Sequence, residues 1–75
     1  MRVEDLVRLH KAEPFRAFRI HLADGRHLEV EHPEFLAHAP KGRIAVVMRL
    51  DDTFDIVDLA LLTSLEVTDS KPRSG

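Results

Sequence analysis

Histidines and acidic residues are the side chains of this 75-residue sequence that could most readily do chemistry. The histidines are His10, His21, His27, His32 and His38. His21 and His27 flank an Ala-Asp-Gly turn and would face each other across a hairpin, where two imidazoles could share a metal ion. Zinc and similar metals require three or four protein ligands, and the neighbouring Arg19 would repel a cation. We therefore expect a solvated sheet face with no cofactor, and a zinc or nickel site at His21 and His27 is the alternative.

Four aspartates, Asp51, Asp52, Asp55 and Asp58, form the densest acidic cluster. They lack the spacing and the glycine of a calcium-binding loop, so turn formation and helix capping explain them better. No serine or threonine falls beside a histidine in the expected topology, and three scattered glycines cannot form a phosphate-binding loop. The sequence therefore predicts a protein that is not an enzyme.

A basic cluster on or near the same hairpin is the candidate binding patch. It consists of Arg16, Arg19, His21, Arg26 and His27, and it would suit RNA or an acidic partner. The chain as a whole has a formal net charge of −2, whereas nucleic-acid binding usually leaves a strongly basic surface. Four Phe with no Trp or Tyr also provide few platforms for base stacking. These features favour a solvated face with Arg19 paired to Glu29.

Composition indicates one small domain, which we place at 1–67. The absence of cysteine excludes disulfides and Cys-type zinc sites. The longest apolar runs, such as Leu59–Leu62, are too short to cross a bilayer, and the polar first residues lack the apolar stretch of a signal peptide. We therefore expect a cytoplasmic protein. At this size the core is marginal, and oligomerisation is a common remedy.

The first two segments are a helix and a hairpin. Apolar residues at helical spacing predict a helix over 3–11, which Pro14 prevents from continuing. Strict alternation then predicts two antiparallel strands around Ala23-Asp24-Gly25. A three-residue loop with Gly25 in a left-handed conformation places apolar residues opposite apolar residues, which a two-residue loop does not. The expected pairs are Phe18–Val30, Ile20–Leu28 and Leu22–Arg26 on the inner face, with Arg19–Glu29 and His21–His27 on the outer face.

The rest of the chain is predicted as three more strands. Residues 32–42 form a connector with a helical turn that begins at Pro33 and a side-chain cap from His32. The apolar run 43–50 is expected to be a central strand covered on both faces. A strand over Phe54 and Ile56, a turn capped by Asp58 and a final strand through Leu65 and Val67 follow. Residues 68–75 are polar and are expected to form a disordered tail.

The segment from Pro14 to Arg26, together with His32-Pro33-Glu34-Phe35, resembles a family of short uncharacterised bacterial proteins. Their shared pattern is roughly PFRPF-x-I-x-L-x-DG-R, HPEF, GR-x-VVV, IDL and TSLEV, and the match spans about residues 14–67 in the same order. Ala17 departs from the pattern, which often has proline there, and Val57 departs within the IDL stretch. The resemblance implies no particular activity.

The predicted fold class is mainly β with an N-terminal helix, as a five-stranded antiparallel small barrel similar to the SH3-like and Sm-like barrels. Such closure would remove exposed sheet edges. The predicted function is a non-enzymatic module that binds a protein partner or itself, with no membrane contact. The alternative is an Sm-like RNA-binding protein that uses Arg16, Arg19 and Arg26.

Overall fold

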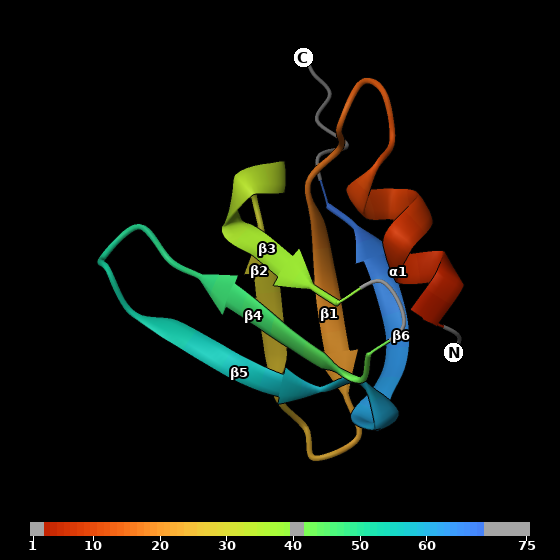
Figure 1. Cartoon of the computed structure of the whole chain (residues 1–75), viewed down its shortest axis with the longest axis vertical. Helices are drawn as coiled ribbons and strands as arrows, with labels where there is room; N and C mark the ends of the chain where they lie inside the picture. Colours follow the sequence, from red (N-terminus) through yellow and green to blue (C-terminus); the bar gives the residue numbers. More distant parts are fainter. Residues whose placement is uncertain (1–2, 40–41, 69–75) are drawn as a thin grey trace.

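A computed structural model describes residues 3–39 and 42–68 of the chain (Figure 1). The helix is α1 (Val3–His10), and two single turns of 3₁₀-helix are η1 (Pro33–Phe35) and η2 (Leu59–Leu61). The strands are β1 (Phe18–Leu22), β2 (His27–Val30), β3 (Leu36–His38), β4 (Ile44–Met48), β5 (Phe54–Asp58) and β6 (Leu62–Val67).

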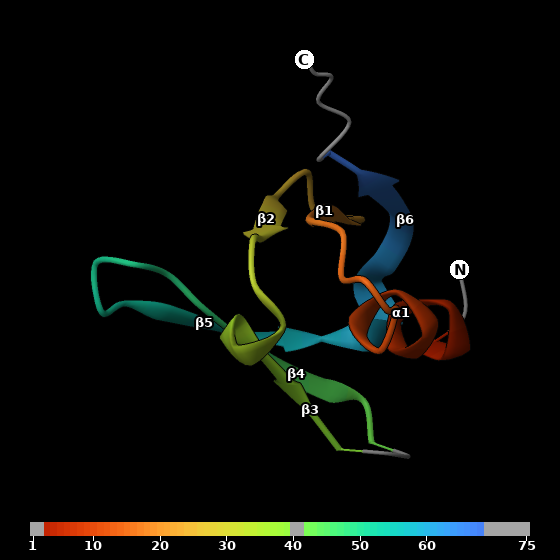
Figure 2. The same cartoon turned by 90° about the horizontal axis from the view of Figure 1, so that it is seen from above.

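The strands form two antiparallel three-stranded sheets, in the orders β2-β1-β6 and β3-β4-β5. Figure 2 shows the sheets as separate layers, with α1 beside β6 at one side of the space between them. The turn that joins β4 to β5 extends away from the body of the domain on the side opposite α1 (Figures 1 and 2).

The prediction of a five-stranded closed barrel, and with it the SH3-like or Sm-like architecture, is wrong. The described residues form six strands, and the two sheets stay separate. The additional strand is β3, which the sequence analysis had assigned to the connector. The sheets do not merge because η1 interrupts the chain between β2 and β3, where Pro33 has no amide to donate to a ladder. A second 3₁₀ turn, η2, which contains no proline and is capped by Asp58, separates β5 from β6.

The predicted hairpin is confirmed in detail. Phe18 pairs with Val30, Ile20 with Leu28, Arg19 with Glu29 and His21 with His27. The Leu22 amide donates to the Arg26 carbonyl at 2.9 Å, and the Gly25 amide donates to the Leu22 carbonyl at 3.0 Å. Gly25 has a φ of +94°, in the region where a side chain would be strained. The three-residue loop therefore sets the register of β1 and β2.

One hydrophobic core fills the space between the sheets. Its side chains come from both sheets and from α1, and the largest fully buried ones are Leu6, Phe18, Ile20, Val30, Val47 and Val57. The helix contributes Leu6, which is completely buried, with Val3 and Leu9 packed around it. The helix ends at His10. The predicted capping of the turn η2 by Asp58 is confirmed, because the Asp58 carboxylate accepts a bond from the Ala60 amide at 2.9 Å.

Two further predictions about this part of the fold need correction. The strand expected over 43–50 is the central strand β4 of its sheet, but only one of its faces is covered. Its side chains alternate between buried positions, at Ala45 and Val47, and exposed positions, at Ile44 and Met48. His32 makes no capping hydrogen bond with its side chain, and its ring instead packs edge-on against Phe35 at 5.3 Å between centroids.

The expected disordered tail lies outside the described residues, apart from Thr68, whose amide donates to the Ala17 carbonyl at 2.9 Å. Within residues 3–39 and 42–68, no helix has the length and apolar character needed to cross a membrane.

Candidate functional site

The five residues of the predicted basic patch do not form one continuous surface. Arg19, His21 and His27 share the outer face of the sheet β2-β1-β6. Arg26 follows the hairpin turn, where it bonds Asp24 at 2.9 Å, and Arg16 precedes the opposite end of β1. A five-residue strand is about 17 Å long, so Arg16 and Arg26 lie too far apart to hold one phosphate.

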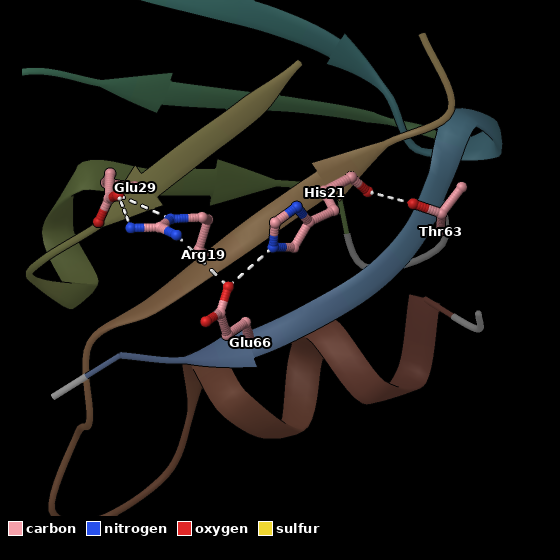
Figure 3. A network of polar contacts seen from close by, with 5 residues as sticks. All are labelled: Arg19, His21, Glu29, Thr63 and Glu66. Atoms are coloured by element: carbon pink, nitrogen blue, oxygen red, sulfur yellow. Dashed lines mark hydrogen bonds and ion pairs between the residues drawn. The ribbon is translucent and has the colours of Figure 1, made fainter. Parts of the chain in front are cut away.

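The basic side chains on this face are matched by acids (Figure 3). Arg19 forms an ion pair with Glu29 at 2.6 Å and a longer one with Glu66 at 3.4 Å. The His21 Nε2 atom lies 2.9 Å from Glu66, and the Thr63 hydroxyl donates to the His21 carbonyl at 3.0 Å. The face is therefore an internally compensated network, with little excess positive charge to attract phosphates.

Glu66 lies at the centre of this network. The hydrogen bond from His21 is the main cause that lowers the pKa of Glu66 below its ordinary value of 4.5. Partial loss of hydration opposes this shift, and the nearby charge of Arg19 adds to it. His21 and His27 are paired across β1 and β2, and their ring centroids are 6.0 Å apart. Within the described parts of the chain, no three histidine or acidic side chains gather into a group that could hold a metal ion.

The acidic cluster has the turn-forming and capping roles that the sequence predicts. Asp51 accepts a bond from the Thr53 amide at 3.1 Å, and Asp55 pairs with Arg49. Asp58 caps η2 and also pairs with Arg43 at 3.1 Å. Hydrogen bonds from the Thr53 hydroxyl and then its amide lower the pKa of Asp51, and the bond from the Ala60 amide lowers the pKa of Asp58. Asp52 adopts a φ of +72°, a left-handed turn conformation that aspartate tolerates.

A pair of histidines joins α1 to the second sheet. His10 Nε2 lies 2.8 Å from the Pro33 carbonyl, so this nitrogen must be the donor. In a neutral His10 the Nδ1 atom is then the acceptor, and it receives a bond from His38 Nε2 at 3.2 Å. The two rings line an open cleft of about 350 Å³ with Val7, Lys11 and Ala37. His10 therefore lies at the boundary between the helix and the second sheet.

The outer face of the sheet β3-β4-β5 has a different character, because it is apolar and exposed. The apolar side chains on this face are Ala37, Ile44, Val46, Met48, Phe54 and Ile56, which we call the outer apolar face, and Asp58 lies at its end opposite Ile44. The exposed fractions are 50% for Ile44, 41% for Met48, 57% for Phe54 and 62% for Ile56. They alternate along the strands with the core residues, so the pleat of the sheet directs them away from the interior.

One charged pair lies at an end of this face, where Asp58, the register partner of Ile44, pairs with Arg43. Arg49 follows Met48 and pairs with Asp55, which is opposite the buried Val47 and therefore on the other side of the sheet. The long apolar run predicts a strand covered on both sides, whereas the structure covers one side and exposes the other. The alternation of Phe54 and Ile56 with Asp55 gave no signal of this exposure, because such alternation is typical of a strand whose apolar side is buried, and the structure buries Val57 instead.

Comparison of the chain with protein-family models, with curated proteins and with solved structures found no match. The function is therefore inferred from the side chains and surfaces of the chain itself.

Proposed function

We propose that this chain is a non-enzymatic interaction module that associates with a second copy of itself through the outer apolar face. The observation that supports this proposal is the concentration of four large exposed apolar side chains on one side of one sheet. Polar and charged residues normally dominate a sheet face that meets water, as they do on the outer face of β2-β1-β6. The cytoplasmic location expected from the sequence is part of the same proposal.

The area of the face is compatible with association. The exposed fractions of the four large residues add up to about two whole side chains, on the order of 400 Å² of apolar surface. The largest apolar patch of an ordinary monomer covers roughly 300–600 Å² and is often functional. A standard interface buries about 800 Å² on each partner, so the outer apolar face would form the centre and its surroundings the rim.

A second copy is a suitable occupant because the face is compatible with itself. None of its six side chains is charged, and Asp58, on the same side opposite Ile44, is paired with Arg43, so two copies can meet face to face without opposing unpaired like charges. The paired Arg43 and Asp58 at its end present both signs to an identical rim. A chain of this size buries only ~60% of its unfolded surface, and covering the face would add to a marginal core.

Packing of faces is favoured over pairing of the β5 edge. Asp55 and Asp58 lie on that edge strand, and charged residues on an edge strand discourage the addition of another strand. Ile56 is at the middle of β5 and is the most exposed member of the outer apolar face. Its replacement therefore gives the most direct test.

The test is the mass in solution, measured by sedimentation equilibrium from micromolar to millimolar protein. The wild-type chain and Ser64→Lys, which adds the same charge to the outer face of the other sheet, should both dimerise. Ile56→Lys should raise the dissociation constant of the dimer by about 30-fold or more. This is the effect of losing a contact worth over 2 kcal/mol at the centre of an interface. Amide NMR spectra check that both variants remain folded.

Mixing two variants of opposite charge provides a further check. Ile56→Lys and Ile56→Glu should each be monomeric alone and should form a mixed dimer together, because the introduced charges then attract. A wild-type chain that stays monomeric at millimolar concentration, or an Ile56→Lys dimer as stable as the wild type, would refute self-association through this face.

A further inference from the structure

The outer edge of β2 offers backbone groups for pairing with another strand. The bond from the Leu22 amide to the Arg26 carbonyl fixes the alternation of the hairpin ladder. Leu28 and Val30 then direct their backbone groups toward β1, while His27 and Glu29 direct theirs away from it. In the sheet order β2-β1-β6, no strand of the described residues pairs with this edge.

A cleft runs beside this edge. Its volume is about 310 Å³, and its walls are His27, Leu28, Glu29 and Glu31 on one side, Phe35, and Arg49 and Leu50 on the other. The last two belong to the turn between β4 and β5, which extends past the sheet β2-β1-β6 (Figure 2). Leu50 is 78% exposed, so the cleft has an apolar contact at its rim as well as Leu28 and Phe35 in its walls.

The charges around the cleft favour a basic occupant. Glu31 lies along the β2 side and is exposed to solvent, while Glu29 on the same side is already paired with Arg19. Arg49, the positive side chain on the opposite wall, is engaged by Asp55 and by the Thr53 hydroxyl at 2.7 Å. A lysine or arginine side chain in the cleft would therefore meet the Glu31 carboxylate, which would repel a phosphate or an acidic peptide.

We propose that this cleft binds an extended segment of a partner protein, with alternating basic and apolar side chains, which pairs with β2 as an additional strand. Main-chain hydrogen bonds to His27 and Glu29 would supply affinity, and alternate side chains would contact the apolar walls and Glu31. The span from His27 to Glu31 is about 14 Å and accommodates roughly five residues of extended chain. Because the cleft lies apart from the outer apolar face, this inference does not depend on self-association.

The edge is suited to pairing although it carries charge. The carboxylate of Glu29 is turned onto the outer face of its sheet, where it contacts Arg19, and it does not obstruct the line of backbone groups. The strand has no proline, and proline is a common means of protecting an edge.

The experiment uses a synthetic six-residue peptide of alternating lysine and valine, titrated into the full chain and followed by amide NMR. Binding should shift the amide signals of His27, Glu29 and Glu31 and protect them from hydrogen exchange. Methylation of the peptide nitrogens that would face β2 removes its donors and should weaken binding by about tenfold or more, the loss of one or two hydrogen bonds.

Charge variants test the proposed partner chemistry. Glu31→Lys should weaken binding of the lysine–valine peptide about fivefold and should strengthen binding of a glutamate–valine peptide by about the same factor. Glu13→Lys makes the same change in net charge in the segment between α1 and β1. This control should leave the ratio of the two peptides' binding affinities nearly unaltered. Equal effects of Glu31→Lys and Glu13→Lys would contradict the proposal, because they would indicate attraction to the whole chain and not to the cleft.

The same titration on Ile56→Lys separates this inference from self-association. Binding should be retained in that variant, since the outer apolar face is not part of the cleft. Peptide binding lost in Ile56→Lys would assign the peptide to the outer apolar face. Undiminished binding of the methylated peptide, or no binding at millimolar concentration, would exclude strand addition at β2.

Discussion

Glu66 shows how single side chains on the polar sheet face depend on one another. Its carboxylate receives the hydrogen bond of His21 and lies beside Arg19, which in turn bridges to Glu29 (Figure 3). Each partner is partly exposed, so the network contributes modestly to stability and mainly orients the four side chains. Arg19 and His21 are consequently structural residues of this face.

The acid limb of the stability curve tests this role. The His21 hydrogen bond lowers the pKa of Glu66 in the folded chain, so the unfolded chain takes up a proton first as the pH falls. The stabilisation is therefore complete above 4.5, the ordinary value, and is lost as the pH falls through the lower pKa of the folded state. Glu66→Gln should reduce stability at neutral pH and make the loss below pH 4.5 shallower, in urea unfolding followed by far-ultraviolet circular dichroism.

Some acid sensitivity should remain in that variant, because hydrogen bonds also lower the pKa of Asp24, Asp51 and Asp58. Glu34→Gln, a change at an exposed residue of η1, is the matched control. An acid limb in Glu66→Gln as steep as that of the control would show that the hydrogen bond from His21 does not stabilise the fold.

At the scale of elements, α1 depends on the sheets for its stability. Eight residues are too few for a stable isolated helix, so docking must hold it in place. Leu6 is fully buried in the common core, and His10 bonds to His38 and to the Pro33 carbonyl. These contacts tie the helix to both β3 and η1.

Leu6→Ala should therefore destabilise the chain by about 3 kcal/mol, the usual cost of removing a buried leucine. Arg8→Ala, on the exposed side of the same helix, should cost less than about 0.5 kcal/mol. Both values come from urea unfolding at pH 7. If the Leu6→Ala variant were too unstable for urea unfolding, faster hydrogen exchange of the Ile20 amide would report its lower free energy of unfolding. Equal effects of the two substitutions would contradict docking through Leu6.

The whole molecule is two sheets that share one core, and this arrangement predicts cooperative unfolding. Phe18 and Ile20 from the first sheet are buried in the same cluster as Val47 and Val57 from the second. Neither sheet has a separate interior to retain if the other opens. Methyl NMR signals of Ile20 and Val57 should therefore disappear with the same midpoint on heating. An earlier loss of the Val57 signal would show that the sheet β3-β4-β5 opens independently.

Features that depend on neighbours in the chain were predictable from the sequence. The hairpin register follows from alternation and a loop whose glycine must be left-handed, and both act within 13 residues. The start and end of α1, the cap by Asp58 and the turn formed by Asp51 are equally local. The pairing of Arg19 with Glu29 followed directly from that register.

Features that depend on how layers meet were not predictable in this way. The three residues of β3 carry too weak a pattern to stand out, and only their pairing with β4 defines them. The cleft beside β2 likewise depends on where the turn between β4 and β5 comes to lie. Residues that form it are up to 23 positions apart, between His27 and Leu50, and no local signal connects them.

The sequence by itself determined the helix, the hairpin and its two faces, because propensity, turn chemistry and alternation act over a few residues. The tertiary structure alone decided that the strands form two open sheets and that the run from Ile44 to Met48 is covered on one side. An apolar strand has the same composition whether one or both of its faces are packed. The number of covered faces depends on the layers available, and the described chain provides one helix for two sheets, so the outer apolar face is left exposed.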